Sequence, residues 1–187
     1  MGTGDNDAMT FRTSATMLAA LAIAAVSSPN AQAGWLDEAK MGVLEHDVPI
    51  GGRHVEPGED INGELLFRSP GLFDLIGAPR PHLGGSVNSS GATSYGYAGL
   101  TWTATFWSSV FASLGLGGAV HNGQLDEPAA HRKELGSRAL FHEELDLGVR
   151  FASRYSLSLF IDHLSDADLT RHNAGLTNIG LRTGYKF

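Results

Sequence analysis

The chain has 187 residues, no cysteine and a formal net charge of −7. That length predicts a single domain, and the lack of cysteine fits a fold that relies on neither thiols nor disulfides. Lys and Arg form no cluster, which argues against a nucleic-acid partner. After residue 33 no run of 18 apolar residues occurs, so no transmembrane helix is predicted.

The first 33 residues have the pattern of a secretory signal peptide. Arg12 supplies a positive charge, residues 17–26 (MLAALAIAAV) form an apolar core, and residues 31–33 (AQA) offer a small-x-small cleavage site. The alternative is a membrane anchor, but this apolar core is short of the roughly 20 residues that span a bilayer. We therefore expect a signal peptide over residues 1–33 and a mature domain over residues 34–187.

Downstream, short runs of alternating polarity are separated by segments rich in Gly, Pro, Ser and Asn. Alternation with a period of two indicates strands, and the intervening clusters mark turns. Apart from a short turn over residues 35–41, no helix is predicted in this part. Eight strands are expected, over Lys40–Val48, Glu59–Ser69, Arg80–Asn88, Ser94–Phe106, Val110–His121, Arg138–Phe151, Tyr155–Ser165 and Leu176–Phe187.

The alternation is two-sided, with one apolar and one polar face along each strand. A soluble β-sandwich and a membrane β-barrel both produce this pattern. Three features favour an eight-stranded antiparallel transmembrane β-barrel. The strand count is even and most strands have about the 9–11 residues that a span needs. The chain ends on aromatics, Tyr185 and Phe187, inside its last strand. Charges of both signs on the polar faces can pair in a narrow lumen.

The seventh strand carries the residues with the clearest chemistry. Leu157, Leu159, Ile161, His163 and Ser165 alternate along it and share one face, which should look at lipid. In a barrel with both termini in the periplasm this strand runs outward, so the last two lie at the level of the outer leaflet. A serine beside an imidazole base is the usual arrangement for acyl transfer.

Several segments resemble the lipid A 3-O-deacylase (PagL-type, acyloxyacyl hydrolase-like) family. They are residues 42–48, 61–67, 79–84, 162–167 (DHLSDA), 173–176 (NAGL) and 180–187 (GLRTGYKF). The His-x-Ser motif is the most specific of them, and the resemblance spans about residues 41–187. It implies a multi-pass β-barrel of the Gram-negative outer membrane that removes a 3-linked hydroxyacyl chain from the lipid A of lipopolysaccharide. By this resemblance His163 is the general base and Ser165 the nucleophile.

Two residues depart from the family pattern. The family has an asparagine directly after the serine, where its amide helps to hold the oxyanion, whereas this chain has Asp166. An ionised carboxylate donates no hydrogen bond and would repel that charge. The family also places an acid fourteen residues after the histidine, and here that position holds Thr177, whose hydroxyl can accept a hydrogen bond but supplies no charge.

Glu143 is the candidate substitute for the missing acid. If a tight turn at residues 152–154 joins the sixth and seventh strands, Glu143 lies opposite His163 and also faces outward. A charge on an otherwise apolar lipid-facing side is costly without a partner. We therefore expect Glu143 to orient or charge-stabilise the imidazole.

No metal or cofactor is predicted, because the other histidines lack the spacing of a zinc site. They are His46, His54, His82, His121, His131, His142 and His172. The glycine-rich segment Gly115–Gly118 lacks the lysine and helix of a phosphate loop, and is interpreted as small residues in a narrow barrel.

The alternatives to an esterase are a catalytically degenerate barrel, structural or lipid-binding, and a secreted soluble sandwich. In the first, His163 and Ser165 would be ordinary polar residues at the rim of the lipid band. The sequence leaves open whether the barrel forms a homodimer, which acyl chain is cut, and whether Met1 or Met9 starts the protein.

Overall fold

The computed structural model describes residues 34–50, 53–126 and 129–187. The expected signal peptide, residues 1–33, lies outside the described residues. None of the described helices is long and apolar enough to cross a membrane.

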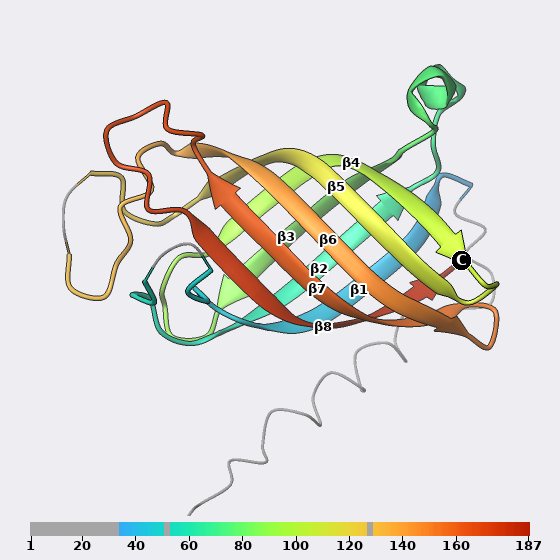
Figure 1. Cartoon of the computed structure of the whole chain (residues 1–187), viewed down its shortest axis with the longest axis horizontal. Helices are drawn as coiled ribbons and strands as arrows, with labels where there is room; N and C mark the ends of the chain where they lie inside the picture. The colour runs from blue at the N-terminus through green and yellow to red at the C-terminus, as the bar shows by residue number, and fades with distance from the viewer. Residues whose placement is uncertain (1–33, 51–52, 127–128) are drawn as a thin grey trace, which may run out of the picture. The chain divides into compact units, whose positions relative to one another are not determined.

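Eight antiparallel strands form one closed sheet (Figure 1). Each strand pairs with its neighbours in the sequence, and β8 pairs with β1 to close the barrel. This confirms the predicted fold and excludes a two-layered sandwich. The strands are β1 (Leu36–Glu45), β2 (Glu59–Phe67), β3 (Arg80–Asn88), β4 (Tyr95–Phe106), β5 (Val110–His121), β6 (Ala139–Phe151), β7 (Tyr155–Ser165) and β8 (Leu176–Lys186).

The first strand differs most from its predicted bounds. It begins at Leu36, so residues 35–41 are not a turn, and it ends at Glu45 rather than Val48. Its early residues alternate only weakly, and their strand conformation comes from pairing with β2 on one side and β8 on the other. Asp47 has a φ of 54°, a left-handed conformation that does not fit a strand.

A short 3-10 helix, η2 (Gly71–Ile76), was not predicted. It follows Pro70, whose fixed φ suits the start of a helix, and it ends at Gly77 with a left-handed φ of 89°. It lies in the connection between β2 and β3, at the end of the barrel that also holds the C-terminus (Figure 1).

The two faces of the sheet divide by polarity as the alternation predicts. Large apolar side chains point outward on every strand, as in β6 with Leu145, Leu147 and Val149, although in β1 the outward Met41 and Val43 are half-buried. The interior is filled with polar and charged groups. Arg182 is fully buried and lies 3.1 Å from Glu64, its partner on β2. A lumen filled in this way is not an open pore.

The two ends of the barrel also differ. The end near the C-terminus has two short turns, residues 107–109 and 152–154, and the longer connection that contains η2. Aromatics stack at this end, such as Trp35 against Phe67 with ring centroids 5.0 Å apart. Aromatics at strand ends are typical of an interfacial girdle. The loops after β1, β3, β5 and β7 gather at the opposite end (Figure 1). The end of β7, where His163 and Ser165 lie, is at this second end.

Candidate active site

Three neighbouring strands bring Glu143, His163 and Thr177 into one row on the outer surface. Glu143 of β6 lies opposite His163 of β7, and His163 lies opposite Thr177 of β8. The register predicted from a tight turn between β6 and β7 is therefore confirmed. Residues directly opposite each other on one face of a sheet are close enough for their side chains to interact.

Thr177 is the residue that holds the imidazole. The Nδ1 atom of His163 lies 2.7 Å from Oγ1 of Thr177, a hydrogen bond between the two strands. Thr177 itself is only 5% exposed. A ring held through Nδ1 presents its other nitrogen, Nε2, as the atom that can exchange a proton with a substrate or nucleophile.

Gly175 keeps the Nε2 edge of that ring open. It has a φ of 58° at the start of β8, and a Cβ atom there would lie 3.0 Å from Cε1 and 3.5 Å from Nε2 of His163. Any side chain would therefore crowd the reactive edge, and the left-handed φ also favours glycine. Sequence reasoning did not identify this residue, because nothing in its neighbours marks it as close to His163.

Glu143 is opposite His163 but does not bind it. The carboxylate is exposed on the outer surface, and among the described residues it makes no hydrogen bond or ion pair. The imidazole is thus oriented by a neutral hydroxyl, with an unpaired carboxylate on its other side. An orienting or charge-stabilising role for Glu143 stays a prediction.

Ser165 shares the outward face of His163 and is half-buried at the end of β7. It lies opposite Phe141 of β6. Its hydroxyl makes no hydrogen bond within the described part of the chain, so the base and the nucleophile are aligned but not bonded to each other. Catalytic hydrogen bonds are often open without substrate and close only in the substrate complex.

Asp166 organises the loop that follows β7. It is 2% exposed, and its carboxylate accepts hydrogen bonds from the backbone N–H groups of Asp168 and Thr170, each at 3.0 Å, and from the Thr170 hydroxyl. The negative charge is therefore directed into the loop and stabilised there. It supplies no donor for an oxyanion, the role that the resemblance implies for this position.

Lys133 fixes the start of β8 from the loop between β5 and β6. Its Nζ atom donates to the carbonyl of Gly175 at 2.8 Å and forms a buried ion pair with Asp47. Burying a charge without a partner is costly, so the pair holds these two loops together beside His163. No sequence motif signals this contact, because its three members come from three different connections.

A second buried charge network closes the loop between β1 and β2. His46 lies 3.0 Å from Glu56 and 3.0 Å from Asp60. Burial opposes the charged ring, but the hydrogen bonds that the ring donates to the two carboxylates, together with their negative charge, outweigh it and raise the pKa of His46 to about 9. Burial likewise opposes the charge of Glu56, yet the hydrogen bonds from His46, Lys133 and Thr93 lower its pKa to about 2.

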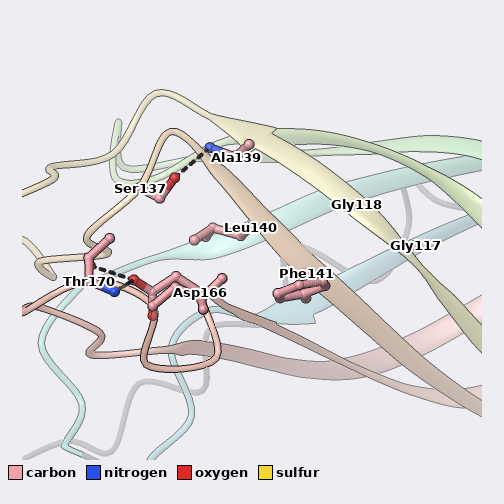
Figure 2. Close-up of a pocket in the computed structure, with 9 residues that line it drawn as sticks. Gly117, Gly118, Ser137, Ala139, Leu140, Phe141, Asp166 and Thr170 are labelled. Carbon is pink, nitrogen blue, oxygen red and sulfur yellow. Dashed lines mark hydrogen bonds between the residues drawn. The ribbon is translucent and has the colours of Figure 1, made fainter.

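A pocket of about 310 Å³ is lined by β5, β6 and the loop after β7, including Asp166, the residue that follows Ser165 (Figure 2). Leu140 and Phe141 of β6 lie along one side, and Asp166 and Thr170 of the loop after β7 lie opposite them in the figure. The complete lining is Gly117, Gly118, Ser137, Ala139, Leu140, Phe141, Asp166, Leu169 and Thr170. A groove of about 480 Å³ adjoins it and shares part of this lining. Both are mostly apolar.

Comparisons with known proteins agree with this arrangement. A family model described as "Lipid A 3-O-deacylase (PagL)" matches residues 77–186, a range that includes the outward row, Ser165 and the pocket. No curated protein matches the sequence.

Two solved structures match the chain to different extents. The "Crystal structure of the outer membrane enzyme PagL" superposes with a TM-score of 0.60 at 18% identity, covering 80% of this chain and 99% of that chain. The Yersinia pestis outer membrane protein Ail in a phospholipid bilayer nanodisc gives a TM-score of 0.44 at 11% identity, covering 81% of this chain and 99% of that one.

Proposed function

The chain belongs to the lipid A 3-O-deacylase (PagL) family, whose model matches more than half of its length, and we propose that it is a serine esterase. Its substrate is lipid A, from which it removes an ester-linked 3-hydroxyacyl chain. The observation that carries the proposal is the 2.7 Å hydrogen bond that holds His163 on the same outward face as Ser165.

The barrel is an outer-membrane protein, with its apolar exterior in the lipid. The three longest connections apart from the one with η2 lie at one end, and the two short turns lie at the other, which is the pattern of the extracellular and periplasmic sides of such barrels. With the short turns in the periplasm, β7 runs outward and ends in the outer leaflet. The site then lies at the level of lipopolysaccharide, the lipid of that leaflet, which brings the ester bonds of lipid A within reach of Ser165.

The reaction takes the two steps of acyl transfer. The Ser165 hydroxyl attacks the ester carbonyl while Nε2 of His163 takes its proton. The bond to the sugar oxygen then breaks, and His163 returns the proton to that oxygen. Water, deprotonated by His163, cleaves the acyl-enzyme and releases the 3-hydroxy acid. The apolar pocket, lined in part by Asp166 and by Phe141, which lies opposite Ser165, accommodates the acyl chain.

The imidazolium form of His163 is less stabilised here than in a Ser-His-Asp triad. Thr177 fixes the ring but adds no charge to stabilise the imidazolium that forms. We assign that charge to Glu143, which lies on the other side of the ring in the register. A carboxylate near the imidazolium favours its charged form even without a direct hydrogen bond.

A catalytically degenerate barrel that still binds lipid is the second candidate. It is favoured by two residues, Asp166 and Thr177, because neither has the chemistry that the family implies at its position.

Mass spectrometry of lipid A separates the two candidates. Purified barrel is incubated with lipid A in detergent micelles, and lipid A is also compared between cells with and without the gene. We expect the loss of one 3-hydroxyacyl chain with the wild type and none with Ser165→Ala. Ser158→Ala, which changes an inward serine of the same strand, is the matched control and should remain active. Deacylation that survives Ser165→Ala would overturn the serine mechanism, and an inactive wild type that binds lipid A would establish the degenerate barrel.

A further inference from the structure

A cluster of two histidines and one glutamate lies inside the barrel. His82 projects from β3, and His142 and Glu144 project from β6. One ligand atom from each lies within 4.8 Å of the others, and all three side chains are buried. Their positions in the sequence show no metal-site spacing, so only the closed sheet brings them together.

Among the described residues, His82 is hydrogen-bonded through Nδ1 and has no hydrogen-bond partner at Nε2. Its Nδ1 lies 2.7 Å from Oγ1 of Thr101, and the Thr101 hydroxyl donates its single proton to Oε1 of Glu144 at 3.1 Å. Thr101 must therefore accept from His82, which assigns the ring proton to Nδ1. The lone pair of Nε2 has no hydrogen-bond partner within the described residues.

His142 shows the same pattern through its other nitrogen. Its Nε2 lies 3.3 Å from a carboxylate oxygen of Asp162, which can only accept, so the ring proton lies on Nε2. Its Nδ1 is buried and has no partner in the described part of the chain. The Oε2 atom of Glu144 is likewise buried and unpaired. All three residues thus keep one free electron pair, and buried polar atoms without a partner are uncommon.

The charge of the interior also favours a cation. Among the described strand residues, six buried carboxylates face two buried cations, Lys40 and Arg182, and two partly buried ones, Arg80 and Arg150. Buried charges in proteins are paired or bind metal ions. A divalent cation would offset most of the remaining negative charge.

Two glycines make room for the cluster. A Cβ atom on Gly115 of β5 would lie 2.3 Å from Cγ and Oε1 of Glu144, and one on Gly99 of β4 would lie 2.9 Å from Cε1 of His82. Either side chain would displace a member of the cluster. The need for glycine at position 115 is therefore explained by the position of Glu144 and not only by the general narrowness of the lumen.

We propose that His82, His142 and Glu144 bind a divalent transition-metal ion of the Zn²⁺ type inside the barrel. Two imidazoles and a carboxylate are a ligand set that such ions prefer. In metal sites the second nitrogen of a ligating histidine donates to a neighbouring oxygen, as His82 does to Thr101 and His142 to Asp162.

The ion would tie β3 to β6 on the inner side of the wall that carries the esterase residues. Asp162, which orients His142, is the neighbour of His163 in β7 and also accepts a hydrogen bond from Asn178, the neighbour of Thr177. The site is therefore a positioning element behind the outward row. It does not depend on the esterase activity and can exist in a degenerate barrel.

The rival explanation is a proton shared between two carboxyl groups. Glu64 also has an unpaired buried oxygen, and a hydrogen bond between Glu64 and a protonated Glu144 would satisfy both. That arrangement needs no metal and leaves the free nitrogens of His82 and His142 unexplained.

Metal content of the refolded barrel tests the proposal. The full barrel is unfolded, freed of metal with a chelator, and refolded in micelles with a small excess of Zn²⁺ or, as a spectroscopic substitute, Co²⁺. After dialysis we expect about one ion per chain by elemental analysis, visible Co²⁺ absorption typical of nitrogen and oxygen ligands, and a raised thermal midpoint. His82→Gln, His142→Gln and Glu144→Gln should each lose the ion.

Two further sets of variants keep the test decisive. Thr101→Val keeps the ligands and removes the partner that orients His82, so it should weaken binding about 10–100-fold without preventing folding. His131→Gln, in an exposed loop, and His121→Gln, a buried histidine outside the cluster, should keep the ion. A wild-type barrel that takes up no ion, or an ion that persists when all three ligands are replaced, overturns the proposal, the latter showing adventitious binding only.

Discussion

The two faces of β7 differ in how fully their polar side chains are hydrogen-bonded. On the outer face, His163 has one side-chain hydrogen bond, and the carboxylate opposite it is unpaired in the described structure. On the inner face, Asp162 accepts from Tyr95 and Asn178 and contacts His142. An inward charge has no access to bulk solvent and must be satisfied by other side chains. An outward group at the membrane rim needs no partner within the protein and is free to bind a substrate. The outward row is therefore available to a substrate, while the inner face of the same strand is held by hydrogen bonds.

The largest effect expected from this contrast is a loss of activity without a loss of stability. His163→Gln removes the base and should reduce the rate of lipid A deacylation at least a thousandfold. The urea midpoint of the barrel should stay close to that of the wild type, because the residue contributes one half-exposed hydrogen bond. A large fall in the midpoint would show that the outer row is structural.

The opposite behaviour is expected from the interior. Arg182→Met leaves Glu64 and Asp146 without their shared cation and should cost about 3–5 kcal/mol of the free energy of unfolding. Urea unfolding in micelles measures this loss. Arg154→Met is the control, since Arg154 is exposed and bonds only Tyr185 among the described side chains. An Arg182 variant as stable as the control would mean that the interior is hydrated enough to tolerate an unpaired charge.

Two substitutions of Thr177 are expected to change activity in opposite directions. Thr177→Val removes the oxygen that holds Nδ1 of His163 and should reduce kcat about tenfold, the effect of losing about 1.4 kcal/mol of orientation. Thr177→Glu places a carboxylate at the family's acid position and should raise kcat above that of the wild type. If neither substitution changes kcat, the hydrogen bond does not serve catalysis.

A smaller effect is expected from the carboxylate across the strand pair. Opposite charges that face each other in a sheet contribute up to about 1 kcal/mol, so Glu143→Gln should lower kcat by at most about fivefold. Glu45→Gln, which changes an exposed acid at the same end of the barrel, is the matched control. Equal rates for the two variants would remove Glu143 from the mechanism.

The smallest effect concerns the pH dependence of the loop between β1 and β2. The raised pKa of His46 stabilises the loop fully below pH 6.5, and that stabilisation is lost as the pH rises through about 9. The lowered pKa of Glu56 stabilises it above pH 4.5, and this is lost as the pH falls through about 2. Both contributions are complete between pH 4.5 and pH 6.5. Amide hydrogen exchange of the loop, corrected for its intrinsic pH dependence, should therefore be slowest in that range. His46→Gln should abolish the alkaline loss, and an unchanged profile would contradict the assignment.

The sequence by itself determined the barrel, the outward face of β7 and the opposition of Glu143 and His163. The outward face and the opposition follow from a period of two and one tight turn, which are local properties of the chain. The barrel was predicted from the even number and the length of the strands, the terminal aromatics and the charges of both signs, because alternation alone also fits a sandwich. Even the residue that binds Nδ1 was at the expected position, although Thr177 holds the ring by a hydrogen bond and supplies no charge.

Only the tertiary structure decided how these residues are supported. The start of β1 depends on pairing with β8, the last strand of the chain. The carboxylate of Asp166 is hydrogen-bonded by its own loop, Lys133 reaches Gly175 from another loop, and the interior cluster joins β3 to β6. Closing the sheet buries these groups away from water, so each must find its partner among residues that are distant in the sequence, and no local pattern records which one it finds.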